Sequence, residues 1–426
     1  MDLPMKNTPC YVLDKAVFVE RLKKVREEIR AFGGKLCYAI KANPFLIPFA
    51  VEIVDKFEVC SPGELEICRL YGVPGEKILF SGVVKAKEDI IKALSYPVDV
   101  ITLESWQHWE LLKSCLRVEE RKDASILGKA DHTEAVSGKA TAKEGLHGTE
   151  EKQPTAKGMI KIMPRLTNGA QFGMEEEEII KVMEEQKEME EITFCGLHYF
   201  TGTQKKGNKY EREIERAGEF LQKLISEYGM GDEILEYGPG FAVPYFVGDD
   251  FDDPYKLMRE MKEYLIEKNY PFRIDIELGR YLAYTCGSYY TKIMDIKKAE
   301  DRNYCLVDGG IHHINYYGSA MAMRTPLTDH LKGMENSSVL MEEEKEYVIC
   351  GALCTFSDIL IRGMQLTNPR IGDILMFKNI GAYSITESGY LFLSRNLPAI
   401  YCKNEDGSHE LLRDKKAAYL LNYIEE

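Results

Sequence analysis

Eight short β-branched runs alternate with longer segments of helical period between residues 36 and 277, and this alternation restricts the possible folds most strongly. Each helical segment places apolar residues three and four positions apart beside charged ones. Strands and helices that alternate in this way form a parallel sheet. Eight units are the number that closes a (β/α)8 barrel, so the pattern predicts an α/β fold of the TIM-barrel type. The predicted strands are 36–40, 57–60, 77–80, 98–101, 160–165, 193–198, 233–237 and 272–277.

The alternation stops near residue 280, and the remaining sequence indicates a second domain. Short alternating runs separated by Gly and Asn are typical of antiparallel strands. We therefore expect a barrel over residues 31–280, followed by a β-rich C-terminal domain over 281–426 that closes with a helix at 415–424. Residues 1–30 contain one strand-like run, 10–13, and we expect this segment to pack with the C-terminal domain. The predicted strands of that domain are 304–307, 347–349, 374–377 and 399–402.

Residues 118–158 interrupt the barrel pattern after its fourth unit. The segment is polar, rich in Gly, Ala, Thr, Lys and Glu, and nearly free of aromatic residues. Such a segment buries too little apolar surface to offset the entropy lost on ordering. We therefore expect a disordered insertion, and we interpret its His132 and His147 as ordinary solvated residues.

The charge and cysteine content exclude several classes of function. Lys and Arg total 55 against 69 Asp and Glu, a formal net charge of −14 that repels nucleic acids and anionic membranes. The longest apolar segment, 45–54, is interrupted by Pro48 and Glu52, and we expect neither a signal peptide nor a membrane span. The eleven cysteines are scattered without a C-x-x-C pair, which argues against a disulfide framework or a zinc site and fits the reducing cytoplasm.

The predicted carboxyl ends of the strands are unusually polar, and in a barrel of this kind functional residues lie there. Lys41 follows the first strand, where burial of its stem can lower the pKa of its amine, as a Schiff-base lysine requires. Taken alone, an ordinary exposed lysine is the commoner explanation. His198 leaves the sixth strand directly into a loop that contains Gly and Thr.

Two further strand ends add groups suited to an anion and a ring nitrogen. Gly238-Pro239-Gly240 ends the seventh strand, and its backbone N–H groups can hold a phosphate, although such a sequence is often only a turn. Glu277 and Arg280 end the eighth strand, where a structural ion pair is the alternative. An amine, an aromatic ring, an anion site and a carboxylate around one mouth suit pyridoxal 5'-phosphate, so we expect this cofactor.

Eight short motifs also occur in a specific order and spacing. In this arrangement they resemble the barrel-type pyridoxal-phosphate decarboxylases, the fold type III family of diaminopimelate, ornithine and arginine decarboxylases with an alanine-racemase-like barrel. The resemblance extends over nearly the whole chain outside 118–158. The motifs are Tyr38-Ala39-Ile40-Lys41-Ala42-Asn43, Phe57-Glu58-Val59-Cys60-Ser61-Pro62-Gly63-Glu64-Leu65, Gln171-Phe172-Gly173-Met174, Gly196-Leu197-His198, Glu277-Leu278-Gly279-Arg280, Val307-Asp308-Gly309-Gly310, Gly351-Ala352-Leu353-Cys354 and Gly381-Ala382-Tyr383.

The resemblance implies roles for the strand-end residues. Lys41 is the Schiff-base lysine, His198 stacks on the cofactor ring, and Glu277 pairs with the pyridine nitrogen. The residues that it assigns to the cofactor phosphate are Gly238, Gly240 and Arg280.

It also implies contributions from outside these strand ends. Arg165 resembles an arginine of the barrel, and Tyr383 resembles the tyrosine of the second domain that reaches the cofactor. Cys354 resembles the cysteine that crosses a dimer interface into the partner's site and handles the proton after CO2 leaves. The family resemblance therefore implies a homodimer with shared active sites.

Several departures from the family pattern occur, at the phosphate turn, before the Gly-Arg pair and at the substrate site. Pro239 replaces a usual glycine and removes one N–H donor, and Leu278 replaces a usual proline. Thr355 follows Cys354 where the family commonly has a carboxylate for a distal amino group, and threonine cannot supply that charge.

The segment after Gly310 also departs from the family, because it lacks the arginine that diaminopimelate decarboxylases use for a distal carboxylate. Its His312-His313 pair resembles relatives that act on an aminoacyl group held on a carrier protein, although loop packing is an alternative for both histidines. Arg324 is a candidate substitute contact for an anion. We count Thr355, His312 and Arg324 as candidate substrate-binding residues.

Together these features predict an amino-acid decarboxylase that resembles diaminopimelate decarboxylase and releases the α-carboxylate as CO2 through a Schiff base with Lys41. Lys41, Cys354 and His198 are the predicted catalytic residues. A decarboxylase of a carrier-linked aminoacyl group and a racemase on the same barrel are alternatives. A cofactor-binding protein without turnover is a further one, but it would need neither Cys354 nor a large C-terminal domain.

Overall fold

The computed structural model describes residues 6–120, 159–229, 233–249, 252–316, 322–333 and 343–424. Residues 121–158 of the predicted insertion, with His132 and His147, lie outside the described residues. Within the described part of the chain, no helix combines the length and the apolar composition needed to cross a lipid bilayer.

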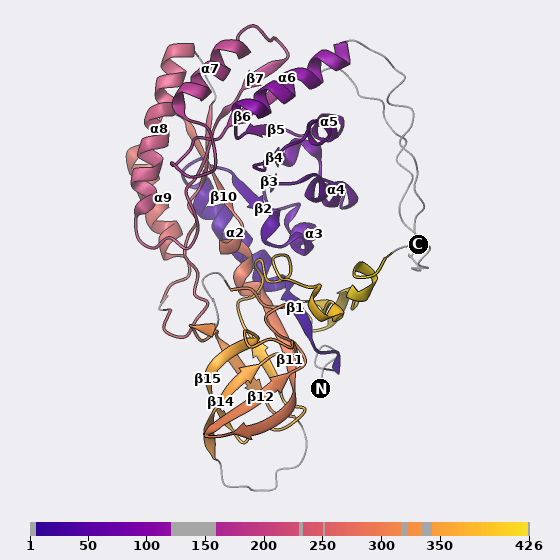
Figure 1. The fold of residues 1–426 in the computed structure, drawn as a ribbon. Coiled ribbons are helices and arrows are strands. Elements are labelled where there is room, and N and C mark those ends of the chain that lie inside the picture. Colours follow the sequence, from indigo (N-terminus) through magenta and orange to yellow (C-terminus); the bar gives the residue numbers. More distant parts are fainter. Residues whose placement is uncertain are drawn as a thin grey trace.

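A nine-stranded sheet of parallel strands forms the barrel and confirms the predicted fold class (Figure 1). Its strands pair in the order β7-β6-β5-β4-β3-β2-β10-β9-β8. The strands are β2 (Leu36–Ala39), β3 (Lys56–Val59), β4 (Ile78–Phe80), β5 (Val100–Leu103), β6 (Ile160–Pro164), β7 (Ile192–Phe194), β8 (Gly196–Phe200), β9 (Ile234–Gly238) and β10 (Arg273–Leu278).

The predicted strand 193–198 is in fact two strands, β7 and β8, separated at Cys195. β7 pairs with β6, and β8 pairs with β9. Cys195 joins both neighbours, because its N–H donates to the Ile162 carbonyl at 3.0 Å and its carbonyl accepts from the Ile234 N–H at 3.0 Å. β7 and β8 therefore occupy one strand position of an eightfold barrel. The break depends on Gly196, where a Cβ would lie 1.9 Å from the Ile234 oxygen.

Helices cover the outside of the strands (Figure 1). α8 illustrates why they form: it turns Ile214, Phe220, Leu221 and Leu224 toward the core and ends at Gly229, whose φ of 65° suits a residue without a side chain. The helices are α2 (Lys15–Arg30), α3 (Ile47–Ala50), α4 (Pro62–Leu70), α5 (Lys87–Ser95), α6 (Trp106–Glu120), α7 (Glu176–Gln186), α8 (Lys209–Tyr228), α9 (Lys256–Lys268) and α10 (Arg280–Ala283).

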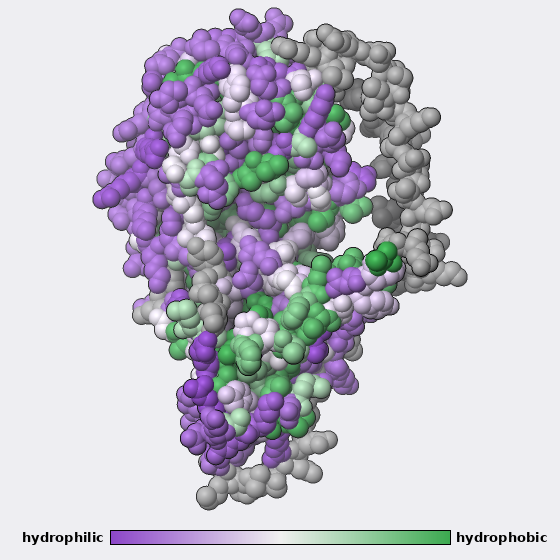
Figure 2. Space-filling model, viewed as in Figure 1, coloured by the Kyte–Doolittle hydropathy of each residue, from purple (hydrophilic) through white to green (hydrophobic). Residues whose placement is uncertain are grey.

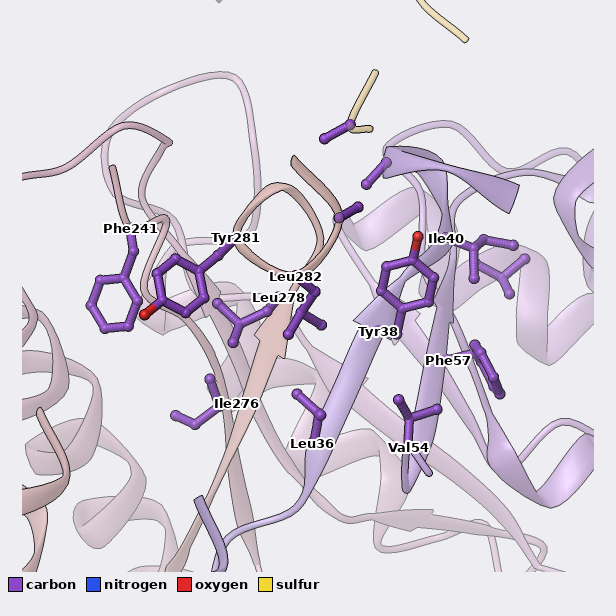
Figure 3. Packing of buried hydrophobic residues seen from close by; sticks show 14 of the residues in the cluster. Leu36, Tyr38, Ile40, Val54, Phe57, Phe241, Ile276, Leu278, Tyr281 and Leu282 are labelled. Atoms are coloured by element: carbon purple, nitrogen blue, oxygen red, sulfur yellow. The ribbon is translucent and has the colours of Figure 1, made fainter. Parts of the chain in front are cut away.

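Alternate side chains along β2 and β10 point in two directions, one toward the hydrophobic core and the other toward the interior of the barrel. Leu36 and Tyr38 of β2 lie beside Ile276 and Leu278 of β10 in one apolar cluster (Figure 3). Because successive side chains of a strand point to opposite faces, Glu277 faces the barrel interior. The predicted site residue of β10, Glu277, is therefore directed away from this core.

The second domain is built mainly of antiparallel strands, and it includes a strand from the N-terminus. The path of its sheet is β15-β14-β12-β11-β1-β17-β18, with β16 paired to β11 and β13. The strands are β1 (Cys10–Asp14), β11 (Gly287–Ala299), β12 (Arg302–Val307), β13 (Thr328–Leu331), β14 (Glu344–Cys350), β15 (Ile359–Thr367), β16 (Ile374–Phe377), β17 (Ala399–Lys403) and β18 (His409–Arg413).

The predicted helix at 415–424 is wrong. Residues Ala418–Leu421 form a single 3-10 turn, and of these only Ala418 is buried. Without a buried apolar stripe, a short segment gains too little from packing to sustain an α-helix. Leu420, Leu421 and Ile424 remain exposed, and Figure 2 shows apolar side chains in this part of the molecule below the polar barrel surface.

Candidate active site

Lys41 is held among acidic groups at the carboxyl end of the barrel. It lies in the short 3-10 helix Ile40–Ala42 directly after β2. Its Nζ donates to Glu58 Oε2 at 2.7 Å and to Oε1 at 3.0 Å, and it lies 4.0 Å from Glu277 Oε1. The Cys60 Sγ is 3.4 Å away. With its side chain 38% exposed, the amine remains accessible to a ligand.

The expected low pKa of the Lys41 amine is wrong. Burial by itself lowers the pKa of the amine, but the opposing effects of Glu58, Cys60 and Glu277 are together larger, and the pKa is raised well above its usual value. The sequence suggested only the burial. The carboxylates that reverse its effect come from β3, the next strand of the chain, and from β10, which is far from Lys41 in the sequence.

His198 and Glu277 form a buried pair beside Lys41. The His198 Nε2 lies 2.9 Å from Glu277 Oε2, which leaves the other carboxylate oxygen toward Lys41. Burial, and then the charge of Arg165, lower the pKa of His198 to about 4, so the ring is neutral at neutral pH. Burial raises the pKa of Glu277, against the opposing charge of Lys41.

The Arg280 guanidinium and two hydroxyl groups lie beside the glycine turn after β9, which is Gly238-Pro239-Gly240. Arg280 Nε donates to Thr203 Oγ1 at 3.2 Å, and its Nη1 donates to the Tyr245 hydroxyl at 2.8 Å. Gly240 has a φ of 57°, and a Cβ there would lie 1.8 Å from the Gly202 carbonyl oxygen. The turn and the loop after β8 are therefore in direct contact, on the side of the mouth where Arg280 lies.

Arg165 and Lys85 extend the polar lining of the mouth. Arg165 Nη1 donates to Glu104 Oε1 at 2.8 Å, and Glu104 Oε2 accepts from the Gly173 N–H at 3.3 Å. Lys85 is buried and donates to the Gly82 carbonyl at 2.7 Å. Burial lowers the pKa of Lys85 to about 8.

The second domain contributes Tyr383 to this mouth. The Tyr383 N–H donates to the Ala42 carbonyl at 2.7 Å, next to Lys41 in the chain. The Arg280 guanidinium lies 4.3 Å from the centre of the Tyr383 ring. Thr386 Oγ1 also donates to the Lys41 carbonyl at 3.2 Å, so two contacts tie this loop to the Lys41 segment.

Cys354 and Thr355 lie elsewhere, on an exposed loop between β14 and β15. Asp358 holds the base of this loop: its carboxylate accepts from the Leu353 N–H at 2.7 Å and from the Ile311 N–H at 2.8 Å. His312 is buried beside this segment and stacks on His313 with ring centres 3.7 Å apart. The described structure shows no contact between this loop and Lys41.

Arg324 does not join the mouth among the described residues. Its Nη2 donates to Asp249 Oδ1 at 2.6 Å, and its guanidinium lies 4.2 Å from the centre of the Phe246 ring. Asp249 in turn accepts from the Tyr245 N–H, so Arg324 lies behind the residues that contact Arg280.

Several residues of the mouth received no role in the sequence analysis. Lys85 follows β4 within five residues, so the strand-end argument used for Lys41 could have found it. Glu58 stands within a motif that carried the family resemblance, but nothing in the sequence indicated its contact with Lys41. The same strand-end argument could have found Glu104, which directly follows β5, and Thr203, which follows β8 within three residues, whereas Tyr245 carries no comparable local signal.

Known proteins similar to this chain are decarboxylases. The family model for the pyridoxal binding domain of pyridoxal-dependent decarboxylases matches residues 15–284. A decarboxylase of L-glutamyl-BtrI acyl-carrier protein from Niallia circulans is 28% identical over 375 residues, 85% of this chain and 80% of that protein. The diaminopimelate decarboxylase of Aquifex aeolicus is 24% identical over 424 residues, 96% of this chain and 90% of that protein.

A solved structure has the same fold. Diaminopimelate decarboxylase from Helicobacter pylori complexed with L-lysine superposes with a TM-score of 0.77 at 17% identity, and the match covers 97% of this chain and 95% of that chain.

Proposed function

The chain belongs to the family of pyridoxal-dependent decarboxylases, and from that premise we propose that it releases the α-carboxylate of an amino acid as CO2 at the mouth that contains Lys41. The observation that carries the proposal is the position of the Lys41 amine, accessible and within 4.0 Å of two carboxylates, Glu58 and Glu277.

The side chains of the mouth fit pyridoxal phosphate. Lys41 offers an amine for the aldehyde, Glu277 a carboxylate for the ring nitrogen, and Arg280 a cation beside the glycine turn for the phosphate. Gly238, Gly240 and Thr203 border the same place, and Arg165 keeps its buried Nε without a protein partner. When bound, the cofactor supplies an electron sink for the electrons of the broken carboxylate bond.

The protein's own residues supply orientation and proton handling. Glu58 holds the Lys41 amine through both carboxylate oxygens, and His198 holds one oxygen of Glu277. Tyr383 brings a hydroxyl to the same mouth. We assign the return of a proton to the substrate carbon to Cys354 or to Tyr383, with Cys354 supplied by the second subunit.

A free amino acid of the diaminopimelate type is the first candidate substrate, because several similar decarboxylases act on diaminopimelate. A carrier-linked glutamyl group is the second candidate, and Thr355 favours it, since a neutral hydroxyl supplies no charge for a distal ammonium group. In either case Thr355 is the proposed contact of the distal part of the substrate, and His312, which is buried beside the same loop, and Arg324 are further residues to test.

A cytoplasmic homodimer with shared sites completes the proposal. Cys354 is exposed, and the neighbouring Phe356 is fully exposed, which is costly for an apolar ring unless another surface covers it. Leu391, Phe392 and Leu393 add exposed apolar area near the C-terminal segment, as expected for an interaction surface. Eleven free thiols suit a reducing compartment.

The test is CO2 release by the purified holoenzyme from meso-diaminopimelate, L-ornithine, L-lysine, L-arginine, L-glutamate and L-glutamyl acyl-carrier protein, each assayed separately. We expect turnover of diaminopimelate or of the carrier-linked substrate, and no turnover by Lys41→Ala. Racemisation of a substrate without CO2 release would contradict the proposal, as would a wild-type protein that binds no pyridoxal phosphate.

A further inference from the structure

A cavity of about 400 Å³ lies in the second domain, beside the loop that carries Tyr383. Ser357 lines it from the loop that carries Cys354, and Glu387 and Ser388 line it from the Tyr383 loop. The cavity therefore borders both loops that the proposed function assigns to proton return. Most of its described lining is apolar, including Ile314, Ile359, Leu360 and Phe377.

Glu387 gives this cavity its charge. Among the described residues that line the cavity, Glu387 is the one charged side chain, and it is exposed. Its Oε2 accepts from the Asn315 Nδ2 at 2.7 Å. Asn315 is neutral, so it orients the carboxylate without compensating its charge. Apolar walls with a single carboxylate suit an aliphatic chain that ends in an ammonium group.

The residue that orients Glu387 is itself held in place. The buried Ser384 hydroxyl accepts from the Asn315 N–H at 3.2 Å and donates to the Asn315 carbonyl at 2.9 Å. The Ser388 Oγ donates to the Ser384 carbonyl at 2.7 Å. The carboxylate is therefore fixed by a connected set of hydrogen bonds, which lowers the entropy cost of binding a ligand there.

The loop that carries Glu387 also reaches the Lys41 segment. Thr386, the preceding residue, donates to the Lys41 carbonyl, and the Glu387 N–H donates to the Tyr383 carbonyl at 2.8 Å. Burial raises the pKa of the Tyr383 hydroxyl; the charge of Lys41 opposes this effect, and that of Glu387 adds to it. The Tyr383 hydroxyl thus lies within electrostatic reach of both groups. A substrate whose reacting amine is at Lys41 can direct its side chain toward Glu387.

We propose that Glu387 is a specificity-determining residue that binds the distal ammonium group of an aliphatic diamino acid, and that Asn315 is its positioning residue. The inference rests on the proposed decarboxylase function and deepens it, because it selects between the two candidate substrates. A carrier-linked glutamyl group has no distal ammonium group and gains nothing from Glu387. Glu387 supplies the negative charge that Thr355 lacks.

The experiment compares two amines on the purified holoenzyme by titration calorimetry. Cadaverine and n-pentylamine share one amino group and the same carbon chain, so their Kd values differ through the second ammonium group of cadaverine. We expect the wild type to bind cadaverine about fivefold more tightly, as for a partly exposed charge pair. Glu387→Gln keeps the shape but removes the charge, and its two Kd values should lie within about twofold of each other.

Two further variants serve as controls, and an unchanged affinity for pyridoxal phosphate shows that each variant folds. Asn315→Ala keeps the charge of Glu387 but releases its orientation, so the preference for cadaverine should fall to about threefold. Glu410→Gln removes an exposed carboxylate of β18 that does not line the cavity, and it should keep the wild-type preference.

A preference for cadaverine that persists in Glu387→Gln would overturn the inference, as would a wild type that binds the two amines equally. Failure of the proposed function would be seen separately. In that case the holoenzyme would still prefer cadaverine but would release CO2 from none of the assayed amino acids.

Discussion

At the scale of single residues, the tightest constraint in the candidate site is at Gly240. Its backbone is left-handed, and a Cβ would lie 1.8 Å from the Gly202 carbonyl oxygen. We expect Gly240→Ala to lower the free energy of unfolding by about 1–3 kcal/mol and to weaken pyridoxal phosphate binding, because the turn must shift. Urea unfolding and cofactor titration measure the two effects.

Gly207→Ala is the matched control. Gly207 also has a positive φ, 70°, but a Cβ there would meet nothing within 4 Å. The control should lower the free energy of unfolding by about 1 kcal/mol from backbone strain alone and leave cofactor affinity unchanged. Equal effects of both substitutions would show that the contact with Gly202 is unimportant.

The buried His312 predicts a pH dependence of stability. Burial, and then the charge of Arg395, lower its pKa from 6.5 to about 4. Between these values the unfolded chain binds a proton that the folded chain excludes, so the free energy of unfolding decreases as the pH falls through this window, by roughly 3 kcal/mol at most.

His312→Phe should therefore give a shallower decrease in stability than the wild type between about pH 6.5 and 4. The phenyl ring keeps the stacking partner of His313 but does not titrate. Urea unfolding of both proteins across this range measures the difference in slope. Parallel curves would mean that His312 does not exclude the proton.

The residues at the ends of the barrel strands are the part of the site that could be predicted from the sequence. Lys41, His198, Glu277 and Arg280 follow or end apolar runs, and the structure brings Lys41, His198 and Glu277 into one network. The prediction for the pKa of Lys41 was wrong because this pKa depends on Glu58. The contact between Glu58 and Lys41 is set by the pairing of β2 with β3.

At the scale of an element, the loop between β14 and β15 depends on Asp358. The carboxylate accepts two backbone N–H groups, and a Cβ at Gly351 would lie 2.3 Å from Asp358 Oδ2. We expect Asp358→Asn to lower kcat at least tenfold with cofactor affinity unchanged, because an amide can no longer accept both bonds and Cys354 loses its position. Steady-state kinetics and cofactor titration measure these.

Ser357→Ala provides the control within the same loop. Its hydroxyl contacts only the exposed Thr355 hydroxyl among the described residues, so kcat should stay within about twofold of the wild type. If Asp358→Asn kept full activity, the loop would need no such anchor.

The boundaries of an element were predictable where its packing follows from the local sequence pattern. The predicted run 10–13 corresponds to β1, and 374–377 to β16, because both are short continuous runs of apolar residues. The break between β7 and β8 had no local signal, since it depends on the approach of Gly196 to the Ile234 carbonyl. The predicted C-terminal helix was wrong because the apolar residues of this segment do not pack against a core.

At the scale of the whole molecule, the proposed shared site predicts complementation. An equal mixture of Lys41→Ala and Cys354→Ala subunits, refolded together, should recover about one quarter of the wild-type activity, since half of the dimers would contain one intact site. Mixing Lys41→Ala with Glu277→Gln subunits should recover no activity, because Lys41 and Glu277 of each site come from the same subunit. Recovery in the second mixture, or none in the first, would contradict the shared arrangement.

The barrel and the β-rich domain were predictable as wholes because each repeats a period over many residues. The closeness of Tyr383 to Lys41 was not predictable from the residues alone, since it depends on how the two domains meet at the Ala42 carbonyl. Only the family resemblance suggested it.

The position of β1 has a consequence for synthesis. β1 lies between β11 and β17, and its Cys10 pairs with Ala399 near the other end of the chain. During synthesis β1 therefore keeps one edge unpaired until β17 has been made. A fragment truncated before β17 exposes this edge, so an isolated barrel for expression should begin at Asp14, which caps α2.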